Sequence, residues 1–134
     1  MNTKTYNILL WIAQVLLAIM FGMAGLMKTS QPITSLAEML PWVEQSPELL
    51  VRIIGVSELL AAVGLLLPAI LKIQPKLTAF AGLGLAVIML LALIFHISRG
   101  EYEAIGINVI LGAIAYFVYW GRNKKAPIVK TRKS

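Results

Sequence analysis

The chain has 134 residues, of which 59% are hydrophobic and 13% charged, and its net charge is +6. Soluble domains carry about 25% charged residues, so this composition excludes an ordinary soluble fold and indicates a single membrane domain over residues 1–134. The chain has no cysteine and one histidine. These counts exclude disulfides, thiol exchange, iron–sulfur clusters and a multi-histidine metal site within one chain.

The first apolar run covers residues 7–27 and lies between Lys4 and Lys28. A secretory signal peptide has an apolar core of about 7–15 residues, followed by a cleavage site of small residues. This run is longer and no clean cleavage site follows it. We therefore predict a retained transmembrane helix over residues 7–27.

The connection that follows carries a short amphipathic pattern. Within residues 32–40, Ile33, Leu36, Ala37 and Leu40 recur at i, i+3, i+4 and i+7, which predicts one apolar stripe on a helix too short to span a bilayer. We expect this helix to lie along the outer surface. Two alternatives stay open: the helix covers the mouth of the bundle, or it only rests on lipid.

The second span, residues 48–71, contains the most informative residue. Ser46 as N-cap, Pro47 at the first helical position and Glu48 in the first turn predict where this helix begins. Glu58 lies ten residues further on, about 15 Å along the helix and near the middle of a hydrocarbon core about 30 Å thick. A carboxylate at that depth costs at least about 2.5 kcal/mol, so it normally faces the protein interior and marks a site.

The third span is predicted over residues 76–98 and the fourth over residues 103–120, with a tight connection at residues 99–101. A basic tail over residues 121–134 follows. It contains six of the twelve basic residues: Arg122, Lys124, Lys125, Lys130, Arg132 and Lys133. This placement is typical of a cytoplasmic segment that flanks a membrane rather than of a protein that binds nucleic acid.

The charges also predict the orientation. Lys4, Lys72, Lys76 and the tail fall on one side of the membrane, and the outer loops carry Glu38, Glu44, Glu48, Glu101 and Glu103. The positive-inside rule then places both termini in the cytoplasm. We expect an integral protein of a bacterial-type cytoplasmic (inner) membrane.

At 100° per residue, the polar residues of each span share a face with glycine or alanine. This pattern predicts an all-α, four-helix membrane bundle with inward polar stripes. The stripes contain Gln14, Gly25 and Lys28; Arg52, Gly55 and Glu58; Gly82 and His96; and Asn108 and Gly112. We assign catalytic roles to Glu58 and His96, and ligand binding to Lys28, Arg52 and Asn108, all in the outer half. Gln14, in the cytoplasmic half, is expected to form a hydrogen bond between helices.

Each of these residues has a structural alternative. Lys28 is an ordinary interfacial lysine if its side chain extends to the membrane surface. For His96 the alternative is a partly hydrated residue at a helix end. For Asn108 it is a hydrogen bond between helices. For Glu58 the alternative is a buried ion pair with Arg52, because a buried charge normally needs a partner.

Two motifs resemble the DoxX-like family of small four-helix membrane proteins. Residues 21–28, ending Gly25-Leu26-Met27-Lys28, are similar to the Gly-x-x-Lys end of that family's first helix, and Gly55-Val56-Ser57-Glu58 is similar to its Gly-x-x-Glu run. The resemblance implies that Lys28, Glu58 and His96 are the family-type polar residues. It also implies a role linked to quinone, oxidative stress or an oxidoreductase, because one member is a subunit of an archaeal thiosulfate:quinone oxidoreductase.

Two functions from different classes remain open. The first is a quinone-linked redox protein, in which a quinone head group binds in the outer half and the helix over residues 32–40 closes over it. The second is a non-catalytic subunit or scaffold of an oxidoreductase complex, or a homo-oligomer, in which the polar residues only fix helix packing. Whether the chain is an enzyme stays undecided, and quinone is the candidate cofactor. A transporter is a distant third, because four spans without a broken helix leave little room for alternating access.

Overall fold

A computed structural model describes residues 2–129 and contains, in that range, helices and no strand. Four long helices are α1 (Thr3–Ser30), α3 (Glu48–Leu71), α4 (Lys76–Ser98) and α5 (Ile105–Lys124). Between them lie α2 (Ile33–Met39) and two short 3-10 helices, η1 (Pro41–Gln45) and η2 (Tyr102–Ala104). The predicted all-α bundle of four spans is thus confirmed. Lys130, Arg132 and Lys133 of the predicted tail lie outside the described residues.

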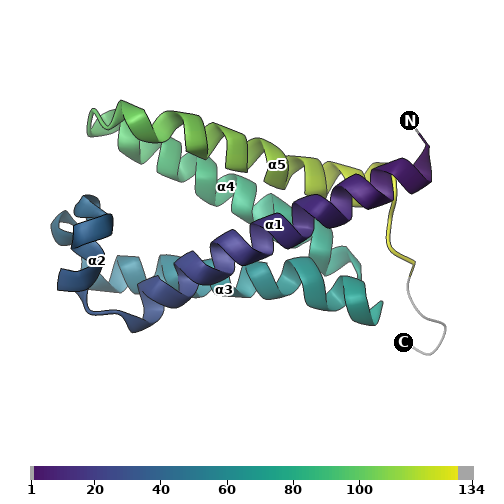
Figure 1. Ribbon diagram of the computed structural model, residues 1–134, viewed down its shortest axis with the longest axis horizontal. Coiled ribbons are helices and arrows are strands. Elements are labelled where there is room, and N and C mark those ends of the chain that lie inside the picture. The colour runs from purple at the N-terminus through teal and green to yellow at the C-terminus, as the bar shows by residue number, and fades with distance from the viewer. Residues whose placement is uncertain (1, 130–134) are drawn as a thin grey trace.

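The helices are arranged as two pairs, α1 with α3 and α4 with α5 (Figure 1). α3 also packs against α4, and α1 packs against α5 at the end where the described termini lie. The turn between α3 and α4 is at this same end. α2, η1 and the α4–α5 turn lie at the opposite end, which we call the outer end after the orientation that the charges predict.

The predicted bounds hold for the second and third spans, whereas the first and fourth helices are longer than expected. α1 begins at Thr3 because the Asn2 side chain caps it, accepting a hydrogen bond from the Thr5 N–H at 2.9 Å. The bounds of α3 thus match, but its predicted N-cap was wrong by one residue. Pro47 is the N-cap and its side chain offers no cap bond, because the Ser46 hydroxyl instead donates to the Trp42 carbonyl at 3.0 Å.

Glycines allow both helix pairs to approach closely. A Cβ atom at Gly25 would lie 2.7 Å from the Gly55 carbonyl oxygen, and one at Gly82 would lie 2.8 Å from the Ala115 carbonyl oxygen. The predicted small-residue faces are therefore the contact faces of α1 with α3 and of α4 with α5.

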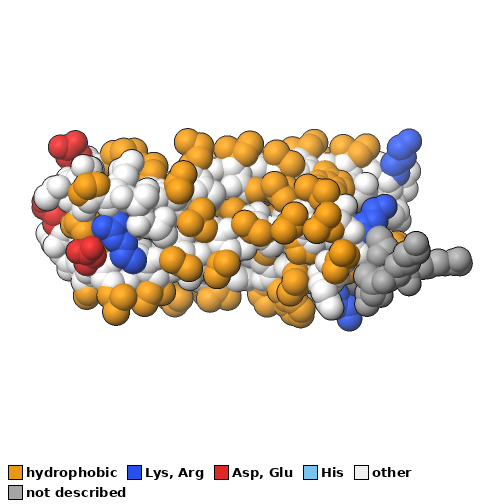
Figure 2. Space-filling view, turned by 90° about the horizontal axis from the view of Figure 1, so that it is seen from below, with side chains coloured by type: hydrophobic (Ala, Val, Ile, Leu, Met, Phe, Trp, Pro, Cys, Tyr) orange, Lys and Arg blue, Asp and Glu red, His pale blue; other side chains and the backbone are white. Residues whose placement is uncertain are grey.

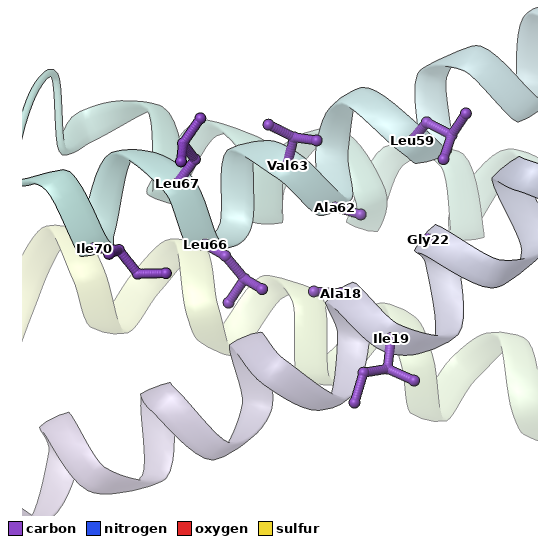
Figure 3. Close-up of a pocket in the computed structure, with 9 residues that line it drawn as sticks. All are labelled: Ala18, Ile19, Gly22, Leu59, Ala62, Val63, Leu66, Leu67 and Ile70. Carbon is purple, nitrogen blue, oxygen red and sulfur yellow. The ribbon is translucent and has the colours of Figure 1, made fainter.

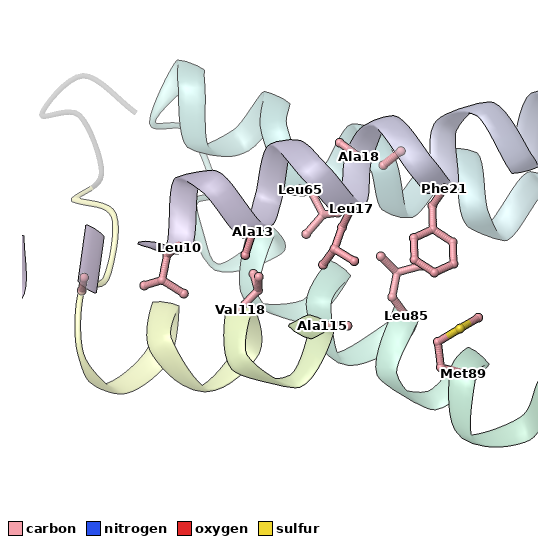
Figure 4. Close-up of a cluster of buried hydrophobic side chains, with 12 residues drawn as sticks. Leu10, Ala13, Leu17, Ala18, Phe21, Leu65, Leu85, Met89, Ala115 and Val118 are labelled. Atoms are coloured by element: carbon pink, nitrogen blue, oxygen red, sulfur yellow. The ribbon is translucent and has the colours of Figure 1, made fainter. Parts of the chain in front are cut away.

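The hydrophobic core lies between the pairs, towards the end with the termini and through the middle of the bundle (Figure 4). Leu10 and Leu17 of α1 meet Leu65 of α3, Leu85 of α4 and Val118 of α5 there, and all five side chains are fully buried. Met89 and Phe21 close this core on its outer side. This hydrophobic core does not extend to the outer end of the bundle.

The outside of the bundle is apolar. Large aliphatic side chains stay exposed on every long helix. On the face in Figure 2 they cover the length between the outer end, where acidic and basic side chains both lie, and the opposite end, where the charged side chains are basic. Each long helix is apolar and long enough to cross a bilayer. Exposed aliphatic residues on such helices face lipid, so the chain is an integral membrane protein.

Candidate functional site

A cavity of about 610 Å³ lies at the outer end, between the α1–α3 pair and the α4–α5 pair. Its walls are mostly apolar and include Ile54, Met89 and Phe95. The polar side chains that line it are Lys28, Glu58, His96, Glu101, Glu103 and Asn108. Four of the five predicted site residues therefore meet in one cavity, and the fifth, Arg52, does not line it.

Lys28 and Glu58 form a buried ion pair across the α1–α3 contact. The Lys28 Nζ lies 2.8 Å from the Glu58 Oε1, and the two side chains are 12% and 2% exposed. The close approach at Gly25 and Gly55 puts the end of α1 within reach of the middle of α3. The snorkelling alternative for Lys28 is therefore wrong: its amine turns inward, because the buried carboxylate is a nearer and stronger acceptor than the surface.

Arg52, the predicted partner of Glu58, has a different role. Its Nη1 donates to the Lys28 and Gln31 carbonyl oxygens at 2.8 and 2.7 Å, and its Nη2 lies 3.4 Å from the Glu48 carboxylate. The last carbonyls of a helix have no partner within the helix. Arg52 satisfies these groups at the end of α1, so the predicted pair with Glu58 was wrong, and its assignment to ligand binding stays a prediction.

His96 is held by a turn for which the sequence predicts only a tight connection. Gly100 has φ 73°, and the Glu101 and Gly100 N–H groups donate to the carbonyls of His96 and Ile97, which is the Schellman pattern at a helix end. This turn folds Glu101 back so that its Oε1 lies 2.8 Å from the His96 Nδ1 and 3.0 Å from the Arg99 Nε. Glu101 was not predicted as a site residue, although a glycine directly after the helix was the signal for it.

Hydrogen bonds from Arg99, and then from His96, hold the pKa of the Glu101 carboxyl below its ordinary value. Glu101 is therefore ionised at neutral pH. Because this pKa is lowered, the hydrogen bonds stabilise the turn fully at pH values above the ordinary carboxyl pKa. Their contribution is lost as the pH falls through the lowered pKa of Glu101.

Asn108 of α5 lines the cavity and is 8% exposed. Its Nδ2 is buried and has no hydrogen-bond partner among residues 2–129. The predicted alternative was a hydrogen bond between helices, and this nitrogen forms none among those residues. A buried donor without an acceptor is costly, so an acceptor from a ligand would be stabilised at this position.

The segment at residues 39–42 covers one side of the cavity and lines it. Trp42 stacks edge-to-face on Phe95 with ring centroids 5.8 Å apart, and the Lys28 Nζ lies 5.9 Å from the Trp42 ring centroid. The predicted apolar stripe anchors this segment, because Leu36 is fully buried against Val51 of α3. Of the two alternatives for the short helix, covering the mouth of the bundle is the one that this packing favours.

Gln14 joins three helices at the other end of the bundle. Its Nε2 donates to the Leu65 carbonyl at 2.7 Å, and its Oε1 accepts from the Arg122 Nε at 2.6 Å. The predicted interhelical role of Gln14 is confirmed. Arg122, predicted as part of the tail, is 5% exposed and also donates to the Asn7 side chain and the Ala126 carbonyl.

A second hollow, about 490 Å³, opens to the outside between α1 and α3 (Figure 3). Aliphatic side chains and Gly22 line it, including Ile19, Leu59 and Leu66. With no polar side chain in its lining, it has no group for acid–base or ligand chemistry. Among residues 2–129 no cluster of three histidine or carboxylate side chains could hold a metal ion. The outer cavity is therefore the candidate site.

Comparison with known proteins gives one match. A family model described as the DoxX-like family matches residues 12–118, which include all four long helices in large part and every polar residue that lines the outer cavity. No curated protein and no solved structure matches the chain.

Proposed function

Since this chain belongs to the DoxX-like family, we propose that its outer cavity binds the head group of a membrane quinone. On this proposal the protein is a quinone-linked redox protein or the quinone-binding subunit of an oxidoreductase. The observation that carries the proposal is the buried, unpartnered Asn108 amide in a mostly apolar cavity that also holds the Lys28–Glu58 pair.

The groups around the cavity suit this ligand. The Asn108 amide and the Lys28 amine can donate to quinone carbonyl oxygens, and Phe95 and Trp42 provide aromatic walls. Conversion between quinone and quinol moves two electrons and two protons. His96 with Glu101, and Glu58 with Lys28, are the groups that would exchange those protons. We assign the electrons to a partner oxidoreductase subunit, because the chain has no cysteine for thiol or iron–sulfur chemistry.

A scaffold without chemistry is the second candidate. The observation in its favour is that several buried polar groups satisfy one another between helices: Lys28 with Glu58, and Gln14 with Leu65 and Arg122. In a membrane such contacts hold helices together by themselves. A purely structural role does not explain why the buried amide of Asn108 has no hydrogen-bond partner.

Substituting Asn108 by leucine separates the two candidates. Asn108→Leu removes a buried unsatisfied amide, so the free protein should become more stable by about 1 kcal/mol. A decyl-substituted benzoquinone should raise the melting temperature of the unmodified protein by binding the folded state, and this rise should shrink in Asn108→Leu. Thermal unfolding in detergent, with and without the quinone, measures both effects.

Thr78→Val is the matched control, because the Thr78 hydroxyl donates to the Gly64 carbonyl at 3.0 Å, between α3 and α4 and away from the cavity. It should lower the melting temperature of the free protein and leave the quinone-induced rise intact. Absence of any rise in the unmodified protein would favour the scaffold.

We also propose that the end with the termini is cytoplasmic in a bacterial-type inner membrane, because Lys4, Lys72, Lys76 and Lys124 lie there. The chain has no cysteine, so a single introduced cysteine is a unique label. In intact cells, a membrane-impermeant thiol reagent should label Glu44→Cys and should not label Lys124→Cys until the cells are opened. The reverse pattern would invert the proposed orientation.

A further inference from the structure

The turn after α4 determines which nitrogen of His96 carries a proton. The Nδ1 lies 2.8 Å from the Glu101 Oε1, and the Arg99 Nε donates to that same oxygen at 3.0 Å. An ionised carboxylate only accepts hydrogen bonds, so Nδ1 must be the protonated nitrogen. In the neutral imidazole the proton-free nitrogen is then Nε2, which makes no hydrogen bond with any residue from 2 to 129.

The cavity thus presents two kinds of group. His96 offers a lone pair on Nε2, whereas Asn108 and Lys28 offer N–H groups. A quinone has only carbonyl acceptors on its head group, so it can satisfy the two donors and leaves the histidine lone pair unmatched. A quinol has hydroxyl groups, which accept from the donors and also donate to the histidine.

We propose, building on the quinone-binding function above, that the cavity binds the quinol in preference to the quinone. One quinol hydroxyl donates to the His96 Nε2, and the Asn108 amide donates to a quinol oxygen. Glu101 is the positioning residue: it touches the imidazole rather than the ligand, and it makes Nε2 the acceptor by holding the proton on Nδ1.

The test measures the affinity of the purified 134-residue chain in detergent for a decyl-substituted benzoquinone and for its dithionite-reduced quinol, under anaerobic conditions. The absence of cysteine means that no thiol can add to the quinone. One net hydrogen bond is worth about 0.5–1.5 kcal/mol, so the quinol should bind about three- to tenfold more tightly near pH 8.

Glu101→Gln should abolish this preference at pH 8, because a neutral amide no longer dictates which imidazole nitrogen is protonated. Glu44→Gln is the matched control: it removes the same charge from the same end, on an exposed side chain outside the cavity, and it should keep the preference. The comparison of quinone with quinol on the unmodified protein needs no variant, so a misfolded Glu101→Gln would not leave the question open.

The outcomes separate this inference from the function on which it rests. If neither form of the ligand binds, the quinone function itself is wrong. If both forms bind the unmodified protein equally at pH 8, the quinone function stands and the preference for quinol is refuted. If the preference persists in Glu101→Gln, Glu101 does not position His96 as proposed.

Discussion

Lys28→Met should lower the free energy of unfolding by about 3–5 kcal/mol, because it leaves the Glu58 carboxylate buried without its cation. Glu58 is 2% exposed and lies ten residues inside α3, so water cannot replace the lost amine at low cost. Breaking a buried pair costs far more than the net worth of the pair, since the remaining charge keeps its desolvation penalty. Reversible unfolding in mixed detergent micelles measures the loss.

A double substitution shows whether the stranded charge is the cause. Lys28→Met with Glu58→Leu removes both charges, so it should recover most of the stability that Lys28→Met loses. Arg52→Met is the comparison, because Arg52 donates to backbone carbonyls of Lys28 and Gln31 rather than to Glu58. Adding Glu58→Leu to Arg52→Met should give no recovery. If Glu58→Leu recovered stability in Arg52→Met and not in Lys28→Met, the result would support the Arg52–Glu58 pair that the sequence suggested.

Gly25→Ala should destabilise the protein by about 3 kcal/mol, at the upper end of the usual cost of overpacking. The new Cβ would lie 2.7 Å from the Gly55 carbonyl oxygen and 2.8 Å from the Leu59 backbone nitrogen. Both are backbone atoms, so the clash can be relieved only by moving α1 away from α3. That movement also draws Lys28 away from Glu58, so the quinone-induced rise in melting temperature should fall as well.

Gly84→Ala gives the matched control within α4. A Cβ at Gly84 would meet no atom within 4 Å, and alanine is favoured over glycine inside a helix by about 0.8–1.0 kcal/mol. The same substitution should therefore stabilise at residue 84 and destabilise at residue 25. Equal effects at the two positions, measured by unfolding in micelles, would mean that α1 and α3 do not cross at Gly25.

Two parts of the proposed site are held in place by different features of the fold. The Lys28–Glu58 pair depends on a helix crossing, whereas His96 and Glu101 depend only on the local turn at Gly100. Substitutions at the crossing should thus change stability and ligand binding together. Substitutions in the turn should change ligand preference with less effect on unfolding, which lets the two halves of the cavity be tested separately.

The class of fold, the four spans and the inward faces of the helices follow from the amino-acid sequence alone. These features are local: a run of about 20 apolar residues must satisfy its backbone hydrogen bonds as a helix in lipid, and the 100° repeat places each polar residue on a face. For that reason residue spacing is enough to group Lys28, Glu58, His96 and Asn108. The same spacing predicts that Gln14 forms a hydrogen bond between helices.

The partner of each polar residue, in contrast, depends on the tertiary packing. Lys28 and Arg52 are both within reach of Glu58 by depth, and the crossing at Gly25 and Gly55 selects Lys28. The reversal at Gly100 brings Glu101 onto His96, and the packing of α5 on α1 buries Arg122 against Gln14. Depth and helical face follow from residue spacing along one helix, whereas contacts between helices depend on crossing points and chain reversals that spacing does not specify.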